Sequence, residues 1–306
     1  MEKISQKTLN DKIEFKGIGL HSGVKVNLTI NPSKPNSGIV FKRTDIEENN
    51  IIQADFKNVI EPVLCTKLEN KDGVSVSTVE HLMAAFYGEG VDNVIVEVDA
   101  PEIPIMDGSA LEFVDAIRSV GTEEQNEPKK FIKVLKKVEV KDGNKFISIE
   151  PLNNDLIIDF ELIYNNPLIR TRRKEFKISN DDLTSIYNSR TFCLYEDIDN
   201  IKRMGLAKGG SLDNAIVVQG NKILNEDGLR NRHEFVYHKI LDCLGDIMLS
   251  GNRIFGHIKT SQGGHALTNK LLKKFFSDKT NWSFQNFDKK ENQNQNSCEN
   301  PVAIGA

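Results

Sequence analysis

The chain contains little cysteine. Its four cysteines, Cys65, Cys193, Cys243 and Cys298, are spread over 306 residues, and none belongs to a Cys-x-x-Cys pair. This spacing argues against a disulfide scaffold and against a thiolate zinc site, and it is typical of free thiols in a reducing compartment. We therefore expect a cytoplasmic protein.

Long apolar runs and a strong charge of one sign are also absent. The longest apolar runs, such as Val94–Val98, are too short to cross a bilayer, and residues 1–16 lack the apolar core of a signal peptide. The net charge of −4 argues against a general nucleic-acid binder. We therefore expect no stable membrane insertion and no nucleic-acid partner.

What the sequence does contain is typical of a globular protein. Hydrophobic residues make up 39% and charged residues 27% of the chain, and 306 residues suffice for one large domain or two ordinary ones. In the first part, apolar periodicity predicts strands at 24–30, 38–42 and 91–98 and helices at 78–87 and 109–120. The polar stretch 121–130 (GTEEQNEPKK) shows no periodicity, and we expect it to be an interdomain linker.

The second part repeats the order of strands and helices. The pattern predicts strands at 132–140, 145–150, 156–162 and 253–259 and helices at 234–250 and 266–276. From residue 285 the chain is rich in Asn and Gln, which predicts disorder. We therefore expect an N-terminal α+β domain (1–122), a C-terminal α+β domain (130–284) and a disordered tail (285–306).

The spacing of histidines suggests that the two parts are copies of one unit. His81 lies about as far ahead of Ser109 as His238 lies ahead of His265, and both histidines fall on predicted helices that run into a strand. Two such units packed face to face would bring one histidine from each to a shared site between the domains.

The predicted helix at 234–250 carries His238, Asp242 and Asp246 at positions i, i+4 and i+8. These positions share one face of a helix, and a His/Asp pair at this spacing can offer a nitrogen and an oxygen to one divalent metal. A solvated face with ordinary helical hydrogen bonds explains the pattern equally well.

A second candidate is Ser77-Thr-Val-Glu80-His81. Two histidines and one carboxylate would leave an open metal position for water, as in catalytic zinc sites, and Glu80 would then take a proton from that water. The alternative is a capping box, in which Glu80 only satisfies a backbone N–H at the start of a helix.

The third candidate is His265, which follows two glycines in a predicted loop. Imidazole titrates near neutral pH, so His265 suits a general acid, and Asp246 is placed to orient or charge it. A histidine at a helix cap is the alternative.

Longer stretches of the chain follow the pattern of a known family. They are GIGLHSG (17–23), VLCTKL (63–68), VSTVEHLMAAFYGEGVDNVIVEVDAPEIPIMDGSA (76–110), SRTF (189–192), GLAKGGSLDNAIVV (205–218), GLRNRHEFVYHKILDCLGD (228–246) and GGHALTNKLL (263–272). In these stretches the chain resembles the UDP-3-O-acyl-N-acetylglucosamine deacetylases, zinc-dependent enzymes of the committed step of lipid A biosynthesis. The resemblance implies two similar domains, each a sheet layered against a pair of helices, with the active site at the domain interface, in a monomer.

The resemblance also implies roles for individual residues. One zinc ion per chain would be held by His81, His238 and Asp242, with Glu80 as general base, His265 as general acid, Asp246 supporting His265, and Thr191 donating to the oxyanion. Substrate contacts would come from Lys239 near the metal, from Phe192 and 195–218 around the acyl chain, and from the site-lining strand segment Leu64 and Cys65. The sequence departs from the family pattern at Gln262. Many family members have a basic residue at this position, where it can meet the diphosphate of the substrate.

Two glycine-containing motifs have simpler interpretations. The stretch 17–23 looks like a dinucleotide-binding motif, but its third glycine comes one residue late and no strand–helix unit surrounds it. We expect a loop near the site, with His21 facing the substrate. We expect Asp107-Gly-Ser109 to be a helix cap and turn.

Three other functions compete with a deacetylase. A zinc peptidase or another amidohydrolase is disfavoured because there is no HExxH motif. A nucleotide-sugar binding protein would not need Glu80 or His265. A structural metal site should have four protein ligands, and the sequence supplies three.

Overall fold

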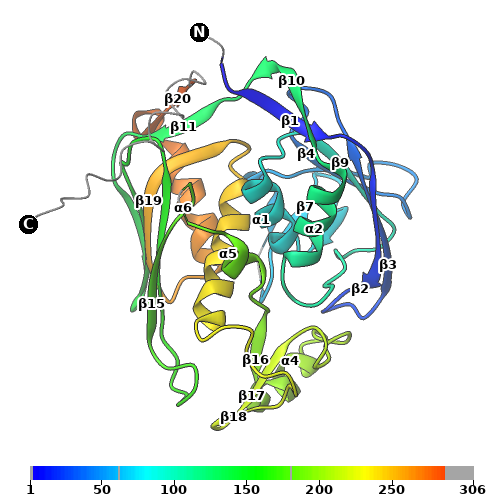
Figure 1. Cartoon of the computed structure of the whole chain (residues 1–306), viewed down its shortest axis with the longest axis vertical. Helices are drawn as coiled ribbons and strands as arrows, with labels where there is room; N and C mark the ends of the chain where they lie inside the picture. The colour runs from blue at the N-terminus through cyan, green and yellow to red at the C-terminus, as the bar shows by residue number, and fades with distance from the viewer. Residues whose placement is uncertain (1–2, 61–62, 180, 287–306) are drawn as a thin grey trace, which may run out of the picture.

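The structure is a computed structural model that describes residues 3–60, 63–179 and 181–286. It has two halves, each with a sheet on the outside and helices on the inside, so that the helices lie between two sheets (Figure 1). The inner helices are α1 (Glu80–Glu89), α2 (Leu111–Val120), α5 (Glu234–Met248) and α6 (His265–Ser277). The predicted two-domain α+β fold is confirmed. The predicted tail, apart from its first two residues, lies outside the described residues.

The first half is built on a five-stranded sheet of order β2-β3-β9-β4-β5, in which only β4 and β9 pair in parallel. Its strands are β2 (Ile13–Ile18), β3 (Lys25–Pro32), β4 (Ile39–Arg43), β5 (Ile51–Gln53) and β9 (Val94–Val98). Along β3, Val26, Leu28 and Ile30 are buried while Lys25 and Asn27 are exposed, as alternation predicts. The turn η1 (Phe56–Asn58) and a small sheet of β6 (Val59–Ile60), β7 (Lys67–Glu69) and β8 (Ser75–Ser77) precede α1.

The second half is built on a seven-stranded sheet. It contains β11 (Phe131–Val134), β12 (Val138–Asp142), β13 (Lys145–Glu150), β14 (Leu156–Leu162), β15 (Arg172–Lys177), β19 (Arg253–Ser261) and β20 (Trp282–Gln285), with the turn η3 (Lys279–Asn281) before β20. The single strand expected at 132–140 is two strands, because the chain bends away at 135–137 and leaves Leu135 exposed.

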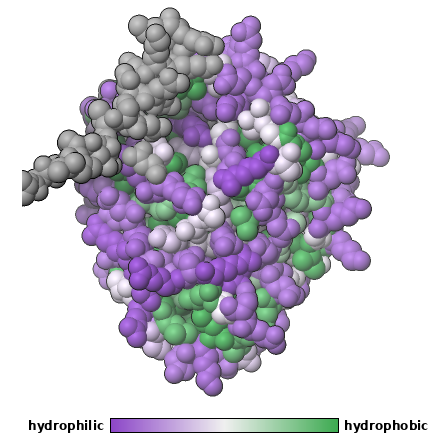
Figure 2. Space-filling view, in the orientation of Figure 1, coloured by the Kyte–Doolittle hydropathy of each residue, from purple (hydrophilic) through white to green (hydrophobic). Residues whose placement is uncertain are grey.

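A smaller three-stranded sheet extends from the second half (Figure 1). It consists of β16 (Phe192–Leu194), β17 (Ile216–Gln219) and β18 (Lys222–Ile223), preceded by α3 (Thr184–Tyr187) and joined by η2 (Tyr195–Asp197) and α4 (Ile198–Arg203). Apolar side chains gather on the surface over this part of the molecule (Figure 2), where Tyr195, Met204 and Leu212 are exposed.

The stretch 121–130, predicted as an interdomain linker without regular structure, is mostly a strand. Residues Thr122–Pro128 form β10, which pairs antiparallel with β1 (Ser5–Leu9) near the start of the chain. The pairing uses backbone hydrogen bonds, so polar side chains do not oppose it, and no periodicity in the sequence reveals it. In the described part of the chain, no helix has the length and apolar character needed to cross a membrane.

The two halves meet where α1 packs against α5. Both helices are buried on nearly all sides, so each is apolar around most of its circumference. Gly245 of α5 lies against the backbone of Glu80, and a Cβ atom at this position would lie 1.9 Å from the Glu80 carbonyl oxygen. The absence of a side chain at residue 245 therefore sets how closely the helices approach.

We predict that Gly245→Ala destabilises the protein by about 1–3 kcal/mol, because the added methyl group must push α5 away from α1. Chemical denaturation would measure the change in the free energy of unfolding. Gly264→Ala is a matched control, since Gly264 has an extended backbone and nothing lies within 4 Å of a Cβ atom built there. If Gly245→Ala and Gly264→Ala were equally stable, the close approach would not constrain the helices.

Candidate active site

Three potential metal ligands converge where α1 meets α5. His81 Nε2 lies 3.5 Å and His238 Nε2 lies 3.4 Å from Oδ1 of Asp242. One ligand atom from each of these three buried residues lies within 4.8 Å of the others. The two halves therefore contribute one histidine each, as the histidine spacing predicted.

The chemistry of these residues fits a divalent metal. His238 Nδ1 lies 3.0 Å from the carbonyl oxygen of Ser189, to which it donates, so Nε2 keeps its lone pair on the side of Asp242. Burial lowers the pKa of His238 to about 3, so its imidazole is neutral, which is the form that binds metals. Two imidazole nitrogens and one carboxylate are the ligands of a catalytic zinc site that keeps a position open.

A second group of potential ligands, Asp159, Glu175 and His257, lies on the sheet of the second half. Arg173 occupies both carboxylate oxygens of Asp159, and the Glu175 side chain is largely exposed. A guanidinium that already neutralises the only buried carboxylate leaves this group a poor metal site.

His265, the first residue of α6, lies close to Glu80 and to the potential metal ligand Asp242. Its Nδ1 lies 2.9 Å from Oδ2 of Asp246, and its Nε2 lies 3.7 Å from Oε1 of Glu80 and 4.0 Å from Oδ2 of Asp242. Burial lowers the pKa of His265, but the charges of Asp246 and Glu80 outweigh it and raise the pKa to about 10. His265 is therefore a cation at neutral pH.

Glu80 is not part of a capping box. Helix α1 begins at Glu80 itself, its N-cap is Val79, and no side chain caps the helix. The Glu80 carboxylate is buried and accepts from the backbone N–H of Thr66 at 3.0 Å, and burial raises its pKa. Thr78, just before the helix, has a φ of 57°, a strained conformation for a β-branched residue and one that clusters at functional sites.

Thr66, in the VLCTKL stretch, is a site residue that was not predicted from the sequence. Its hydroxyl lies 2.6 Å from Oδ1 of Asp246 and 3.0 Å from Nδ1 of His265, and the residue is 2% exposed. Nothing in its local sequence indicated this position, because its partners come from three distant helices.

A cavity of about 840 Å³ opens beside these residues. Of the predicted substrate contacts, His21, Leu64, Phe192 and Lys239 line it. Thr191, predicted to donate to the oxyanion, also lines it, together with His238 and His265. It continues into the small sheet, where its lining is largely apolar and includes Tyr195, Ile198, Ile201, Leu212 and Val217. Gln262 also lines it.

Two predicted contacts are placed differently from expectation. Leu64 and Cys65 lie in a bend between β6 and β7 and not in a strand, with Leu64 at a φ of 63° and 54% exposed. Cys65 is buried outside the cavity lining, where burial raises the pKa of its thiol to about 12. The positive φ turns the chain at this point, so Leu64 and Cys65 face different environments.

Lys239 projects from α5 toward the metal ligands. Its ammonium lies 2.9 Å from Oδ2 of Asp242 and 6.0 Å from the centre of the Phe192 ring. A cation held beside both the ligand carboxylate and an aromatic face is well placed to contact a polar substrate group next to the metal.

The loop that ends the stretch 17–23 is held by a buried carboxylate. Glu102 accepts from the backbone N–H groups of His21 and Ser22 at 2.8 and 2.7 Å, and from the Thr78 hydroxyl at 2.8 Å. A Cβ atom at Gly19 would lie 2.4 Å from a carboxylate oxygen of Glu102, which explains the glycine. Burial lowers the pKa of His21, so its neutral ring lines the cavity.

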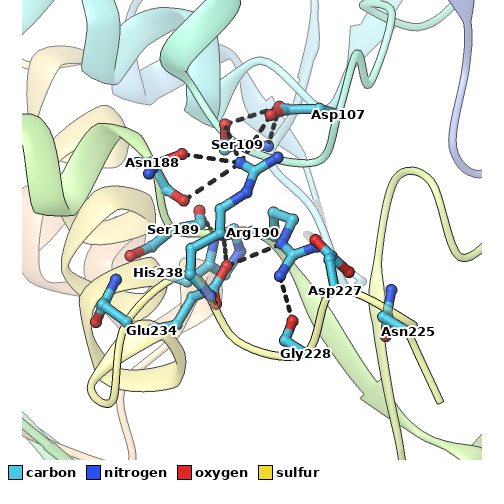
Figure 3. A network of polar contacts seen from close by, with 12 residues as sticks. Asp107, Ser109, Asn188, Ser189, Arg190, Asn225, Asp227, Gly228, Glu234 and His238 are labelled. Carbon is cyan, nitrogen blue, oxygen red and sulfur yellow. Dashed lines mark hydrogen bonds and ion pairs between the residues drawn. The ribbon is translucent and has the colours of Figure 1, made fainter. Parts of the chain in front are cut away.

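A network of charged groups supports helix α5, which carries His238 and Asp242 (Figure 3). Arg190 is buried and pairs with Glu234 at 2.9 Å and with Asp227 at 2.7 Å. The carboxylate of Glu234 also accepts from the backbone N–H of Arg190. This network fixes residues 189–191, and with them the Ser189 carbonyl that orients His238.

The same network joins the two halves, because Arg230 contacts both Asp107 and Asn188, which are labelled in Figure 3. Arg230 pairs with Asp107 at 2.8 Å and donates to the side-chain oxygen of Asn188 at 3.0 Å. Asp107 also accepts from the backbone N–H of Ser109 at 2.9 Å, as a turn residue would. The predicted turn at 107–109 is confirmed, but the predicted helix cap is wrong, because the N-cap of α2 is Ala110 and its side chain makes no capping hydrogen bond. The motif additionally bridges the halves, which local sequence could not indicate.

This fold, with two histidines and one carboxylate converging beside a cavity, is that of a metalloenzyme. A family model described as UDP-3-O-acyl N-acetylglycosamine deacetylase matches residues 6–277 of the chain. The chain belongs to the UDP-3-O-acyl-N-acetylglucosamine deacetylase family, as its motifs predicted.

Curated relatives agree with the family model. The UDP-3-O-acyl-N-acetylglucosamine deacetylases of Actinobacillus succinogenes and of Haemophilus influenzae (strain PittEE) are each 46% identical to this chain over 291 residues, which cover 94% of this chain and 95% of the relative. That of Haemophilus ducreyi is 44% identical over 288 residues, covering 93% of this chain and 94% of the relative.

We predict that Glu234→Gln destabilises the protein by about 3–5 kcal/mol, because it leaves the buried Arg190 guanidinium without its buried counter-charge. Asp227→Asn is the matched control: it removes the other carboxylate from the same guanidinium, but the Asp227 side chain is 60% exposed. We expect it to cost about 1 kcal/mol or less. Equal losses in urea denaturation would contradict the assignment of Glu234 as the buried counter-charge.

Proposed function

We propose that this chain hydrolyses the N-acetyl amide of UDP-3-O-acyl-N-acetylglucosamine with the help of one zinc ion. Water adds to the acetyl carbon, the C–N bond breaks, and the products are acetate and UDP-3-O-acyl-glucosamine with a free amine. The proposal rests on one observation. The potential metal ligands His81, His238 and Asp242 lie close to Glu80 and His265 beside a largely apolar cavity. Membership of the deacetylase family supports the substrate class.

Zinc is proposed because of the donor set. His81 and His238 offer imidazole nitrogens, Asp242 offers an oxygen, and three protein ligands leave one position open. When bound, zinc polarises the amide carbonyl and lowers the pKa of water to about 7.

The proton transfers are assigned to Glu80 and His265. The buried Glu80 carboxylate accepts the proton of the attacking water, as a general base. His265, held as a cation by Asp246, donates a proton to the departing nitrogen, because an amine leaves poorly unless it is protonated. Thr191 lines the cavity and donates to the carbonyl oxygen as charge develops there, a contribution typically of about 3–4 kcal/mol in the transition state.

The cavity accounts for the rest of the substrate. Lys239 contacts a polar group beside the metal, and Phe192 begins the apolar passage between η2, α4 and β17 in which the acyl chain lies. His21 and Leu64 border the passage from the other half. Burial of the chain's methylene groups favours binding by about 0.8 kcal/mol each.

We further infer a monomeric, cytoplasmic enzyme whose small-molecule substrate is its principal partner. Cys65, Cys193 and Cys243 are free thiols in the structure, which suits a reducing compartment. Both histidine ligands and both proton-transfer groups come from one chain, so the proposed chemistry requires no second subunit.

We expect purified protein to release free amine from UDP-3-O-acyl-N-acetylglucosamine, to stop when treated with a chelator, and to recover on addition of one equivalent of zinc. Amine appearance and acetate release would both be followed, across several acyl lengths. Folded, zinc-loaded protein that releases neither product would contradict the proposal and favour a nucleotide-sugar binding protein.

We predict that His265→Ala lowers kcat by about 10²–10⁴-fold, the usual contribution of a general acid, while bound zinc is unchanged. His238→Ala should lower both zinc content and kcat, because it removes a ligand. Metal analysis and steady-state kinetics separate the two outcomes. His257→Ala, which changes a histidine on β19 outside the site, should leave both quantities as in the wild type. Wild-type kcat in His265→Ala would disprove its assignment as the acid.

A further inference from the structure

We propose that Thr66 is a positioning residue that joins the proposed base and the proposed acid into one hydrogen-bonded unit. The proposal rests on the deacetylation proposed above and adds a residue to it. Thr66 lies just before β7, and its contacts reach α1, α5 and α6, the three helices that carry the reacting groups.

The backbone of Thr66 fixes Glu80. Its N–H donates to Oε2 of Glu80 at 3.0 Å, and its carbonyl oxygen accepts from the N–H of Val79, immediately before α1. One carboxylate oxygen of Glu80 is thereby held, and the other, Oε1, is left toward Nε2 of His265.

The hydroxyl of Thr66 fixes His265. It has one proton, which it donates to Oδ1 of Asp246 at 2.6 Å, because a carboxylate can only accept. Its oxygen can then accept from Nδ1–H of His265, 3.0 Å away, which also donates to Oδ2 of Asp246 at 2.9 Å. The hydroxyl therefore keeps a proton on Nδ1, so that Nε2 is the nitrogen directed at the reacting groups.

Asp246 alone would not hold the ring in this way. One carboxylate oxygen restrains His265 along a single direction, and the ring could still pivot about that contact. Thr66 contacts the same nitrogen and the second oxygen of the same carboxylate, so the acid and its supporting carboxylate are held by a third element. Such restraint matters because misplacement of a catalytic group by about 1 Å can cost about 10²-fold in rate.

Two substitutions separate the hydroxyl from the rest of the side chain. Thr66→Val removes the hydroxyl and keeps the shape, and Thr66→Ser keeps the hydroxyl and removes a methyl group. Both keep the backbone N–H that holds Glu80. We expect Thr66→Val to lower kcat about 10–100-fold with KM and bound zinc unchanged, and Thr66→Ser to stay within about threefold of the wild type. If Thr66→Val does not fold, as judged by circular dichroism, Thr66→Ala replaces it.

A double-mutant cycle shows whether Thr66 acts through His265. In the His265→Ala background we expect Thr66→Val to change kcat by less than about threefold, since residues that act as a unit are not additive. Three outcomes would overturn the proposal for Thr66 while leaving the deacetylation intact. They are a full loss of kcat in the His265→Ala background, equal losses in Thr66→Val and Thr66→Ser, and wild-type kcat in Thr66→Val. Failure of the wild type to release amine would overturn the deacetylation and this proposal together.

Discussion

The contact between α1 and α5 at Gly245 is the constraint on which the site depends. Each helix carries only part of the proposed chemistry: His81 comes from one half, and His238 and Asp242 come from the other. Because the Glu80 backbone rests directly on Gly245, Nε2 of His81 and Nε2 of His238 come within 3.5 and 3.4 Å of Oδ1 of Asp242. Metal binding requires ligand positions accurate to a few tenths of an ångström, which a loose interface could not maintain.

The interior of the protein contains charged side chains, and those named here are each paired with a group of opposite charge or with hydrogen-bond donors. Arg190 and Glu234 neutralise one another beneath residues 189–191, and Glu102 is satisfied by backbone N–H groups and by Thr78. A buried charge without a partner would cost several kcal/mol. The pairing therefore lowers the free-energy cost of burying these charges, and it also fixes the backbone that orients the potential metal ligands. The strained backbone at Thr78 is tolerated because its hydroxyl is held in this way.

Sequence alone predicted the parts of the molecule whose signals are local. The His238-x₃-Asp242-x₃-Asp246 repeat falls on the expected face of a helix, and β13 and β14 have the expected bounds. The ribbon of β1 and β10, the small sheet at β16–β18 and the role of Thr66 were missed. The ribbon and Thr66 depend on partners far away in the chain, such as Asp246, which is 180 residues from Thr66. In the small sheet, β16 pairs with β17 across the intervening segment that contains η2 and α4. Spacing within a helix can be read from the sequence, whereas contact between distant segments requires the fold.

The proposed reaction also requires that two facing groups hold opposite protonation states. Glu80 must be ionised to take a proton, while His265, 3.7 Å away, must already carry one. Burial alone would neutralise both, because it raises the pKa of Glu80 and lowers that of His265. Asp246 reverses this for His265, whose pKa rises to about 10, and the resulting cation in turn favours ionised Glu80. The carboxylate behind the histidine therefore favours the charged state of His265, and the hydroxyl of Thr66 contacts both that carboxylate and the ring.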